Sequence, residues 1–194
     1  AARYARPSRA DLFSLVLARA LGATLLTGDR HLRTAAEREG VAVHGTLWLL
    51  DKLVTQCVVT REQAAEALCA QLRQAHDALA QAARAWPRQR VLYLIWKDPW
   101  MAVSRDTYIA RMLALAAWET LPAKAAARYP RLQLDQALVQ DADLVLLSSE
   151  PYRFRARHVA ELQALPAMRG KTVALIDGEM TSWYGSRAIA GLGY

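Results

Sequence analysis

The sequence predicts an α/β protein made of two small parallel-sheet units of the three-layer α/β/α type, joined by a long helix. Short apolar runs alternate with segments of helical period over residues 9–55 and again over 91–194, which is the pattern of parallel strands joined by crossover helices. Between these stretches, no Gly or Pro interrupts a helical pattern from Thr60 to Pro87. With 194 residues, 54% of them hydrophobic and 22% charged, the chain has the composition of a globular protein.

The first unit is predicted to open with a helix at Arg9, which Ser8 caps and Gly22 stops. The elements that follow are a strand, a helix, a second strand and a second helix, at residues 23–27, 29–39, 41–43 and 46–55.

The connecting helix is predicted to begin with a capping box, because Thr60 is followed three residues later by Gln63. It should run for about 25 residues and end at Pro87, which cannot continue a helix. We place the join between the units within it, between Gln74 and Ala82. The predicted domains are residues 1–74, a remainder of the connecting helix at 75–87, and a second domain at 88–194.

The second unit is predicted to be α/β again. Strands are expected at residues 91–96, 143–148 and 172–176, and helices at about 105–117, 133–139, 155–164 and 184–191.

The net charge of +7 lies mainly in the first half, where residues 1–90 hold 13 Lys and Arg against 8 Asp and Glu. A basic half attracts RNA phosphates, but a solvated basic face is the commoner outcome, so nucleic acid is not the expected partner. No apolar run approaches the ~20 residues of a bilayer span. The first residues lack the apolar core of a signal peptide, which predicts a cytoplasmic protein for the chain as written.

Residues 9–74 contain Asp11-Leu-Phe-Ser-Leu-Val-Leu-Ala-Arg, Leu25-Leu-Thr-Gly-Asp29-Arg-His-Leu-Arg and Val43-His-Gly-Thr-Leu-Trp-Leu-Leu. These motifs resemble the C-terminal half of a PIN-domain ribonuclease. The resemblance implies that Asp11 and Asp29 match the third and fourth acidic positions that hold Mg²⁺ or Mn²⁺ in that family. Two carboxylates are a poor metal cage, so we expect remnants of a site and no catalytic residues. Alternatively, each aspartate simply stabilises a helix N-terminus, by ~0.3–1 kcal/mol.

Residues 90–194 contain Leu94-Ile-Trp-Lys-Asp-Pro-Trp-Met101, Leu147-Ser-Ser-Glu-Pro-Tyr152 and Asp177-Gly-Glu-Met-Thr-Ser-Trp-Tyr-Gly-Ser-Arg187. This run resembles the C-terminal lobe of the cobalamin- and siderophore-binding periplasmic proteins of ABC importers, the helical-backbone metal receptors. The resemblance implies a corrinoid or metal-chelate ligand, an ABC permease as partner and a periplasmic location for that family. It also implies that the opposite lobe of the cleft is missing, which would weaken binding.

The resemblance places the ligand-binding side chains on loops that follow strand ends. These loops should gather at the carboxyl edge of the sheet, where open α/β folds bind ligands. The expected residues are Trp96, Trp100, Tyr129, Tyr152, Trp183, Tyr184 and Arg187. The alternative is that the aromatic members belong to the core. Asp135 matches the carboxylate with which the family docks on its permease, or else is a first-turn helix residue. No clustered histidines predict direct metal binding.

Three hypotheses therefore stay open: a non-catalytic solute-binding lobe, truncated or fused; a PIN-type ribonuclease whose missing acids come from elsewhere; and a structural fusion without retained activity. The join has two explanations as well. In the first, two helices are fused in register, which costs little because the continuous helix needs no new nucleation step. In the second, the join is an accident of gene rearrangement or of sequence assembly.

Overall fold

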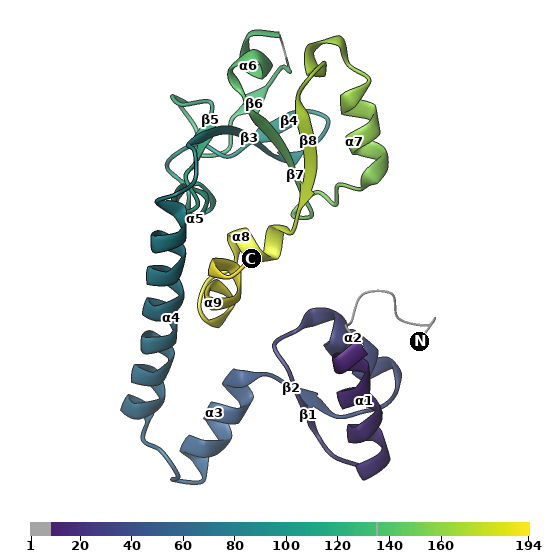
Figure 1. The fold of residues 1–194 in the computed structure, drawn as a ribbon, viewed down its shortest axis with the longest axis vertical. Coiled ribbons are helices and arrows are strands. Elements are labelled where there is room, and N and C mark those ends of the chain that lie inside the picture. Colours follow the sequence, from purple (N-terminus) through teal and green to yellow (C-terminus); the bar gives the residue numbers. More distant parts are fainter. Residues whose placement is uncertain (1–8, 135) are drawn as a thin grey trace. The chain divides into compact units, whose positions relative to one another are not determined.

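The computed structural model describes residues 9–134 and 136–194, and its chain divides into two units between Leu68 and Cys69. Figure 1 shows helices and strands alternating along both. Both units contain parallel strands, which confirms the predicted α/β class. The unit boundary falls inside the long helix, and the domain limits at residues 74 and 87 stay predictions.

The first unit holds a two-stranded parallel sheet in which Leu25 pairs with Val43. Its elements are α1 (Arg9–Leu21), β1 (Leu25–Leu26), α2 (Arg30–Arg38), β2 (Val43–His44) and α3 (Thr46–Thr55). The second strand begins at Val43 rather than at Val41, because the backbone N–H of Val41 takes part in the C-terminal cap of α2. Gly40 has a φ of 69°, and the Val41 N–H donates to the Ala36 carbonyl at 2.9 Å, which closes the helix as a Schellman motif does.

A small apolar core holds this unit together. It consists of Leu15, Ala18, Leu25, Leu32, Ala35, Ala36 and Val41. Three of these residues come from α2, whose buried face carries alanines, so α1 can approach it closely.

The long helix α4 (Arg61–Ala83) begins as predicted. The Thr60 N–H donates to Gln63 Oε1 at 2.9 Å and the Gln63 N–H donates to Thr60 Oγ1 at 3.1 Å, which are the two reciprocal bonds of a capping box. The helix is 23 residues long and ends before Pro87.

The second unit is built on a six-stranded mixed sheet with the order β6-β4-β3-β7-β8, in which β5 also pairs with β3. Its strands are β3 (Gln89–Trp96), β4 (Trp100–Ala102), β5 (Trp118–Leu121), β6 (Arg131–Leu132), β7 (Leu144–Ser148) and β8 (Thr172–Ile176). Its helices are α5 (Tyr108–Leu115), α6 (Gln136–Asp141), α7 (Ala156–Gln163), a 3-10 turn at Pro166–Met168, α8 (Gly178–Ser182) and α9 (Ser186–Leu192).

The three predicted strands β3, β7 and β8 are the parallel centre of this sheet. The sequence did not predict β4, β5, β6 and α8. The amino-terminal half of β3 pairs with β5 in parallel and its carboxyl-terminal half pairs with β4 antiparallel. Strands of two to four residues carry too little periodicity to be recognised. Trp100 accordingly opens a strand and does not lie in a loop.

Both faces of the sheet are buried, as parallel sheets require. Alternate residues of β3 point to opposite faces: Leu92 and Leu94 belong to one core, Tyr93 and Ile95 to the other. The first core receives apolar side chains from α6 and α7, and the second receives them from α5. The unit is therefore a three-layer α/β/α sandwich, visible in the upper part of Figure 1.

Candidate functional site

A pocket of about 620 Å³ lies at the carboxyl edge of the second unit's sheet. Side chains from the end of β3, from β4, α5 and α8, and from the loops before β6 and after β7 surround it. They are Ile95, Trp96, Met101, Ile109, Tyr129, Glu150, Pro151 and Ser182. The loops predicted to converge therefore do meet at one place.

Two of the predicted ligand-binding residues line this pocket directly. Trp96 is 39% exposed and Tyr129 is 47% exposed. Rings that are half in the protein and half in solvent are held in place and still present an apolar face to a ligand.

Trp183 lies beside the pocket, because its indole N–H donates to Glu150 Oε2 at 2.9 Å. The Arg187 guanidinium stacks over the Trp183 ring at 5.2 Å from the ring centre and forms an ion pair with Glu179 at 2.5 Å. These contacts connect α8, α9 and the loop after β7 into one rim, with the indole ring 45% exposed.

Tyr184 is the most exposed of the predicted residues, at 71%. Its ring meets the ring of Tyr108 edge-on at 4.6 Å. The Tyr108 hydroxyl donates to the Trp183 carbonyl at 3.3 Å, and burial raises the pKa of Tyr108. This pair of rings extends the aromatic surface along the rim.

Trp100 and Tyr152 pack against the core instead of lining the pocket, as the alternative interpretation predicted for some aromatics. Trp100 stacks parallel to Phe154 with ring centres 6.1 Å apart, and Tyr152 lies 4.7 Å from Phe154. Tyr152 also meets Trp96 edge-on at 5.6 Å. Tyr152 therefore supports the Trp96 ring, and direct contact with a ligand stays a prediction for both Trp100 and Tyr152.

Beneath the pocket, Tyr93 is fully buried and its hydroxyl ties three elements together. It donates to Ser148 Oγ at 3.1 Å, at the end of β7, and lies 2.6 Å from Thr181 Oγ1, in α8. Burial raises the pKa of Tyr93, so the phenol stays protonated. This network fixes the positions of the loops that carry Glu150 and Trp183.

His158 is 2% exposed and closes the start of α7. The Arg155 N–H donates to its Nδ1 at 2.9 Å. Because a backbone N–H only donates, Nδ1 is the acceptor of this bond. Nε2 lies 3.2 Å from the Arg157 Nε and 3.4 Å from the Tyr152 hydroxyl.

Burial lowers the pKa of His158, since the charged ring would lose its hydration. The surrounding charges are mixed. The cations Arg157, Lys97 and Arg155 lower the pKa further, whereas Glu161 raises it. Lys97 forms an ion pair with Glu161 at 2.5 Å, and this hydrogen bond raises the pKa of the lysine and lowers that of the carboxyl.

We expect the second unit to lose stability as the pH falls from 7 to 5 because of His158. The folded-state pKa lies below the unfolded value of ~6.5, so the unfolded chain takes up the proton first and unfolding is favoured below that pH. In the matched variant His158→Gln, a capping side chain is kept without a titrating group. Urea unfolding should show a smaller loss between pH 7 and 5 in the variant than in the wild type. Equal losses would contradict this role.

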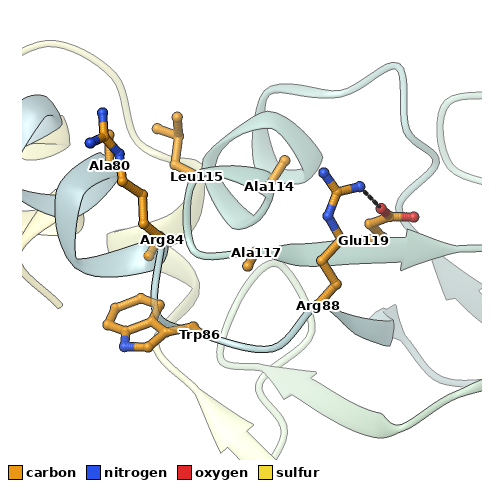
Figure 2. A pocket seen from close by; sticks show the side chains of 9 residues that line it. Ala80, Arg84, Trp86, Arg88, Ala114, Leu115, Ala117 and Glu119 are labelled. Atoms are coloured by element: carbon orange, nitrogen blue, oxygen red, sulfur yellow. Dashed lines mark hydrogen bonds and ion pairs between the residues drawn. The ribbon is translucent and has the colours of Figure 1, made fainter.

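A second, more polar groove of about 470 Å³ lies between the end of α4 and the end of α5. Figure 2 shows Arg84 and Trp86 at one end and the Arg88–Glu119 ion pair, 3.1 Å long, at the other. Arg105 holds the second oxygen of Glu119 at 3.0 Å. The only carboxylate of the groove lining is thus neutralised by the protein's own cations.

The two aspartates of the PIN-like segment do not fit a metal centre. Asp29 is the N-cap of α2, and its Oδ1 accepts the Leu32 N–H at 2.6 Å. Asp11 lies in the first turn of α1. Within the described part of the chain, no group of three or more His, Cys, Asp and Glu side chains is arranged to hold a metal ion. Asp135, the predicted permease contact, lies outside the described residues.

Comparison with known proteins supports both resemblances. Residues 7–83 match the model of the family described as DUF3368, PIN domain. In fold, the chain as a whole, and not its second unit alone, is similar to solved structures of periplasmic solute-binding proteins. No curated protein matches the sequence.

Three of these structures illustrate the likeness. The periplasmic vitamin B12-binding protein of Vibrio cholerae has 14% identity and a TM-score of 0.56, over 91% of this chain and 74% of its own. A possible iron-binding periplasmic protein from Staphylococcus epidermidis has 14% identity and a TM-score of 0.58, over 91% and 76%. A periplasmic heme-binding protein from Pseudomonas aeruginosa has 21% identity and a TM-score of 0.52, over 88% and 68%.

At these identities, the likeness establishes the fold and not the ligand. Among residues 9–134 and 136–194, no helix combines the length and the hydrophobicity that crossing a bilayer demands.

Proposed function

We propose that the second unit is a non-catalytic solute-binding lobe that holds a broad, flat metal chelate, of corrinoid or haem type, at the carboxyl edge of its sheet. The observation that carries the proposal is the 620 Å³ pocket with Trp96 and Tyr129 in its wall. Flat rings bury large apolar areas against aromatic faces, and such pockets need only a few polar groups to fix orientation. Glu150 and Ser182 provide those groups.

Arg187, which forms an ion pair with Glu179, is the cation of the rim that an anionic substituent of the ligand could meet. Arg187 lies over Trp183, and Trp183 is bonded to Glu150 at the pocket. A guanidinium at the edge of a flat ring can meet a propionate or a phosphate in a bidentate manner. The similar structures include a vitamin B12-binding protein, a possible iron-binding protein and a heme-binding protein, which supports a metal chelate as the ligand. The same likeness makes an ABC permease the proposed partner.

A titration of the full chain tests this function. The second unit supplies one wall of a cleft, so we expect cyanocobalamin or haemin to bind with a micromolar or weaker Kd, at a 1:1 ratio. Trp183→Ala should weaken that binding because it removes the indole beside Glu150. Tryptophan fluorescence measures the Kd of the wild type and the Kd of Trp183→Ala. Binding that Trp183→Ala leaves unchanged would show that Trp183 does not contact the ligand.

A second candidate function is a metal-dependent ribonuclease, which the PIN-family match over residues 7–83 favours. We propose that this half is inactive, because Asp29 already caps α2 and no third ligand is arranged with it in the described residues. Mg²⁺ or Mn²⁺ would bind only if further acidic groups came from another chain.

The purified chain should therefore not cleave single-stranded RNA in Mn²⁺. Asp29→Ala should instead lower the stability of the first unit by ~1 kcal/mol through loss of the cap. A gel assay with labelled RNA and a urea unfolding curve measure the two effects. Mn²⁺-dependent cleavage that disappears in Asp29→Ala would contradict the proposal.

A further inference from the structure

A pocket of about 430 Å³ lies in the second unit and shares no lining residue with the carboxyl-edge pocket. It begins beside the amino ends of β3 and β5, at Gln89 and Trp118. The end of α4, the end of α5 and both C-terminal helices, α8 and α9, complete its wall. The proposed chelate site leaves this pocket unexplained.

The wall of this pocket is almost entirely apolar. Two indoles, two thioethers and four leucine or isoleucine side chains dominate it: Trp86, Trp118, Met112, Met180, Leu79, Leu113, Ile176 and Leu192. Among the described residues, no Asp, Glu, Lys or Arg lines it. Methionine side chains adapt to differently shaped partners and make favourable contacts with aromatic rings. The indole faces and the thioethers of this wall suit an aromatic ligand.

The polar groups at the pocket already have partners within the protein. The Trp118 indole N–H donates to Gln89 Oε1 at 3.0 Å, and Thr181 Oγ1 lies 2.6 Å from the Tyr93 hydroxyl. The Tyr194 hydroxyl accepts the Asp177 N–H at 3.2 Å. Water in such a space finds few hydrogen-bond partners and is readily displaced by an apolar ligand. A charged ligand would find no counter-ion among the described side chains that line this pocket.

The volume limits the size of the occupant. At ~30 Å³ of liquid per water, 430 Å³ corresponds to ~14 waters, at the lower end of small-molecule sites. A corrinoid or a haem is too large, and so is an amphipathic helix of several turns. We propose that this pocket is a second ligand site, which takes a small uncharged aromatic molecule of two or three rings.

The test uses the full chain and the uncharged dye N-phenyl-1-naphthylamine, whose emission rises in apolar surroundings. We expect a saturable rise at one dye per chain, with energy transfer from the tryptophans. Ala116 lines the pocket, whereas Ala114, two residues earlier in the chain, lines the polar groove shown in Figure 2 and not this pocket. Ala116→Phe should fill the pocket and weaken dye binding ~10-fold or more, equivalent to ~1.4 kcal/mol. The matched control Ala114→Phe should stay within about twofold.

A thermal unfolding curve for each variant establishes that the variant is folded. If the phenylalanine prevents folding, Ala116→Leu replaces Ala116→Phe. The leucine variant should weaken dye binding by a smaller factor. Equal dye affinity in the wild type and a folded Ala116 variant would overturn the proposal. So would the absence of saturable binding by the wild type. Dimerisation that rises with concentration and that Ala116→Phe abolishes, without dye binding, would assign the surface to a second copy of the chain and also overturn it.

Discussion

Gly191→Ala should destabilise the second unit by ~3 kcal/mol or more, the largest effect we expect from any single methyl group in this chain. A Cβ at position 191 would lie 2.1 Å from the Met180 carbonyl oxygen and 3.2 Å from its carbonyl carbon. Both atoms belong to the backbone, so no side chain can turn away. α9 would have to separate from α8 by about 1 Å, since ordinary C···O contacts are at least ~3.3 Å long. That movement would loosen the buried residues Ala188 and Leu192.

Urea unfolding followed by tryptophan fluorescence measures this loss, because five of the six tryptophans lie in the second unit. Gly193→Ala is the matched control. Its Cβ would meet only the Ala190 carbonyl at 3.7 Å, an ordinary contact, and the φ of Gly193 is −96°. The control should unfold within about 0.5 kcal/mol of the wild type. A Gly191→Ala variant as stable as Gly193→Ala would mean that α8 and α9 do not pack this closely.

Contacts of this kind cannot be predicted from the sequence. Gly191 was expected only as part of a final helix, and the role of Gly178 was not foreseen. A Cβ at Gly178 would lie 2.5 Å from Ser148 Oγ and 2.9 Å from the Glu150 N. Ser148 and Gly178 are far apart in the sequence and meet only because β7 and α8 are adjacent in the fold. The hydrophobic periodicity of a helix or strand predicts which of its own faces is buried. It does not predict how closely the backbone of a neighbouring element approaches.

Local signals, in contrast, predicted most of the architecture. The Thr60–Gln63 capping box defined the start of α4, and the absence of Gly and Pro indicated its length, although the helix ends at Ala83 and not directly before Pro87. The apolar runs of β3, β7 and β8 identified the parallel core of the sheet. The short strands β4, β5 and β6 depend on tertiary pairing and left no pattern. Their absence from the prediction is why Trp100 was assigned to a loop.

The candidate site was predicted in part for the same reason. The carboxyl-edge rule placed the loops of Trp96, Tyr129 and Trp183 correctly, because strand direction alone determines that edge. The sequence did not show which of the aromatic side chains pack against the core. Trp100 and Tyr152 pack against Phe154, and that contact requires knowledge of β4. The composition of their loops indicates aromatic side chains but does not indicate where each side chain points.

Trp96→Ala should produce the second large effect, on ligand affinity. A flat chelate lying against the exposed part of this indole would lose ~100 Å² of buried apolar area in the variant. At ~25 cal/mol per Å² that loss is ~2.5 kcal/mol, or ~70-fold in Kd. The fold should tolerate the change, since Trp96 is 39% exposed at the end of β3. Isothermal titration calorimetry with cyanocobalamin or haemin measures the Kd without relying on tryptophan emission.

The most direct test of a chelate-binding lobe is that calorimetric titration on the wild type, Trp96→Ala and Trp86→Ala side by side. Trp86 is the matched control, because it is 46% exposed in the same unit but lies away from the carboxyl-edge pocket. We expect micromolar or weaker binding in the wild type, an unchanged Kd in Trp86→Ala and a Kd raised ~70-fold in Trp96→Ala. Equal affinities in Trp96→Ala and Trp86→Ala, or no heat of binding in the wild type, would contradict the assignment of the ligand site to this edge.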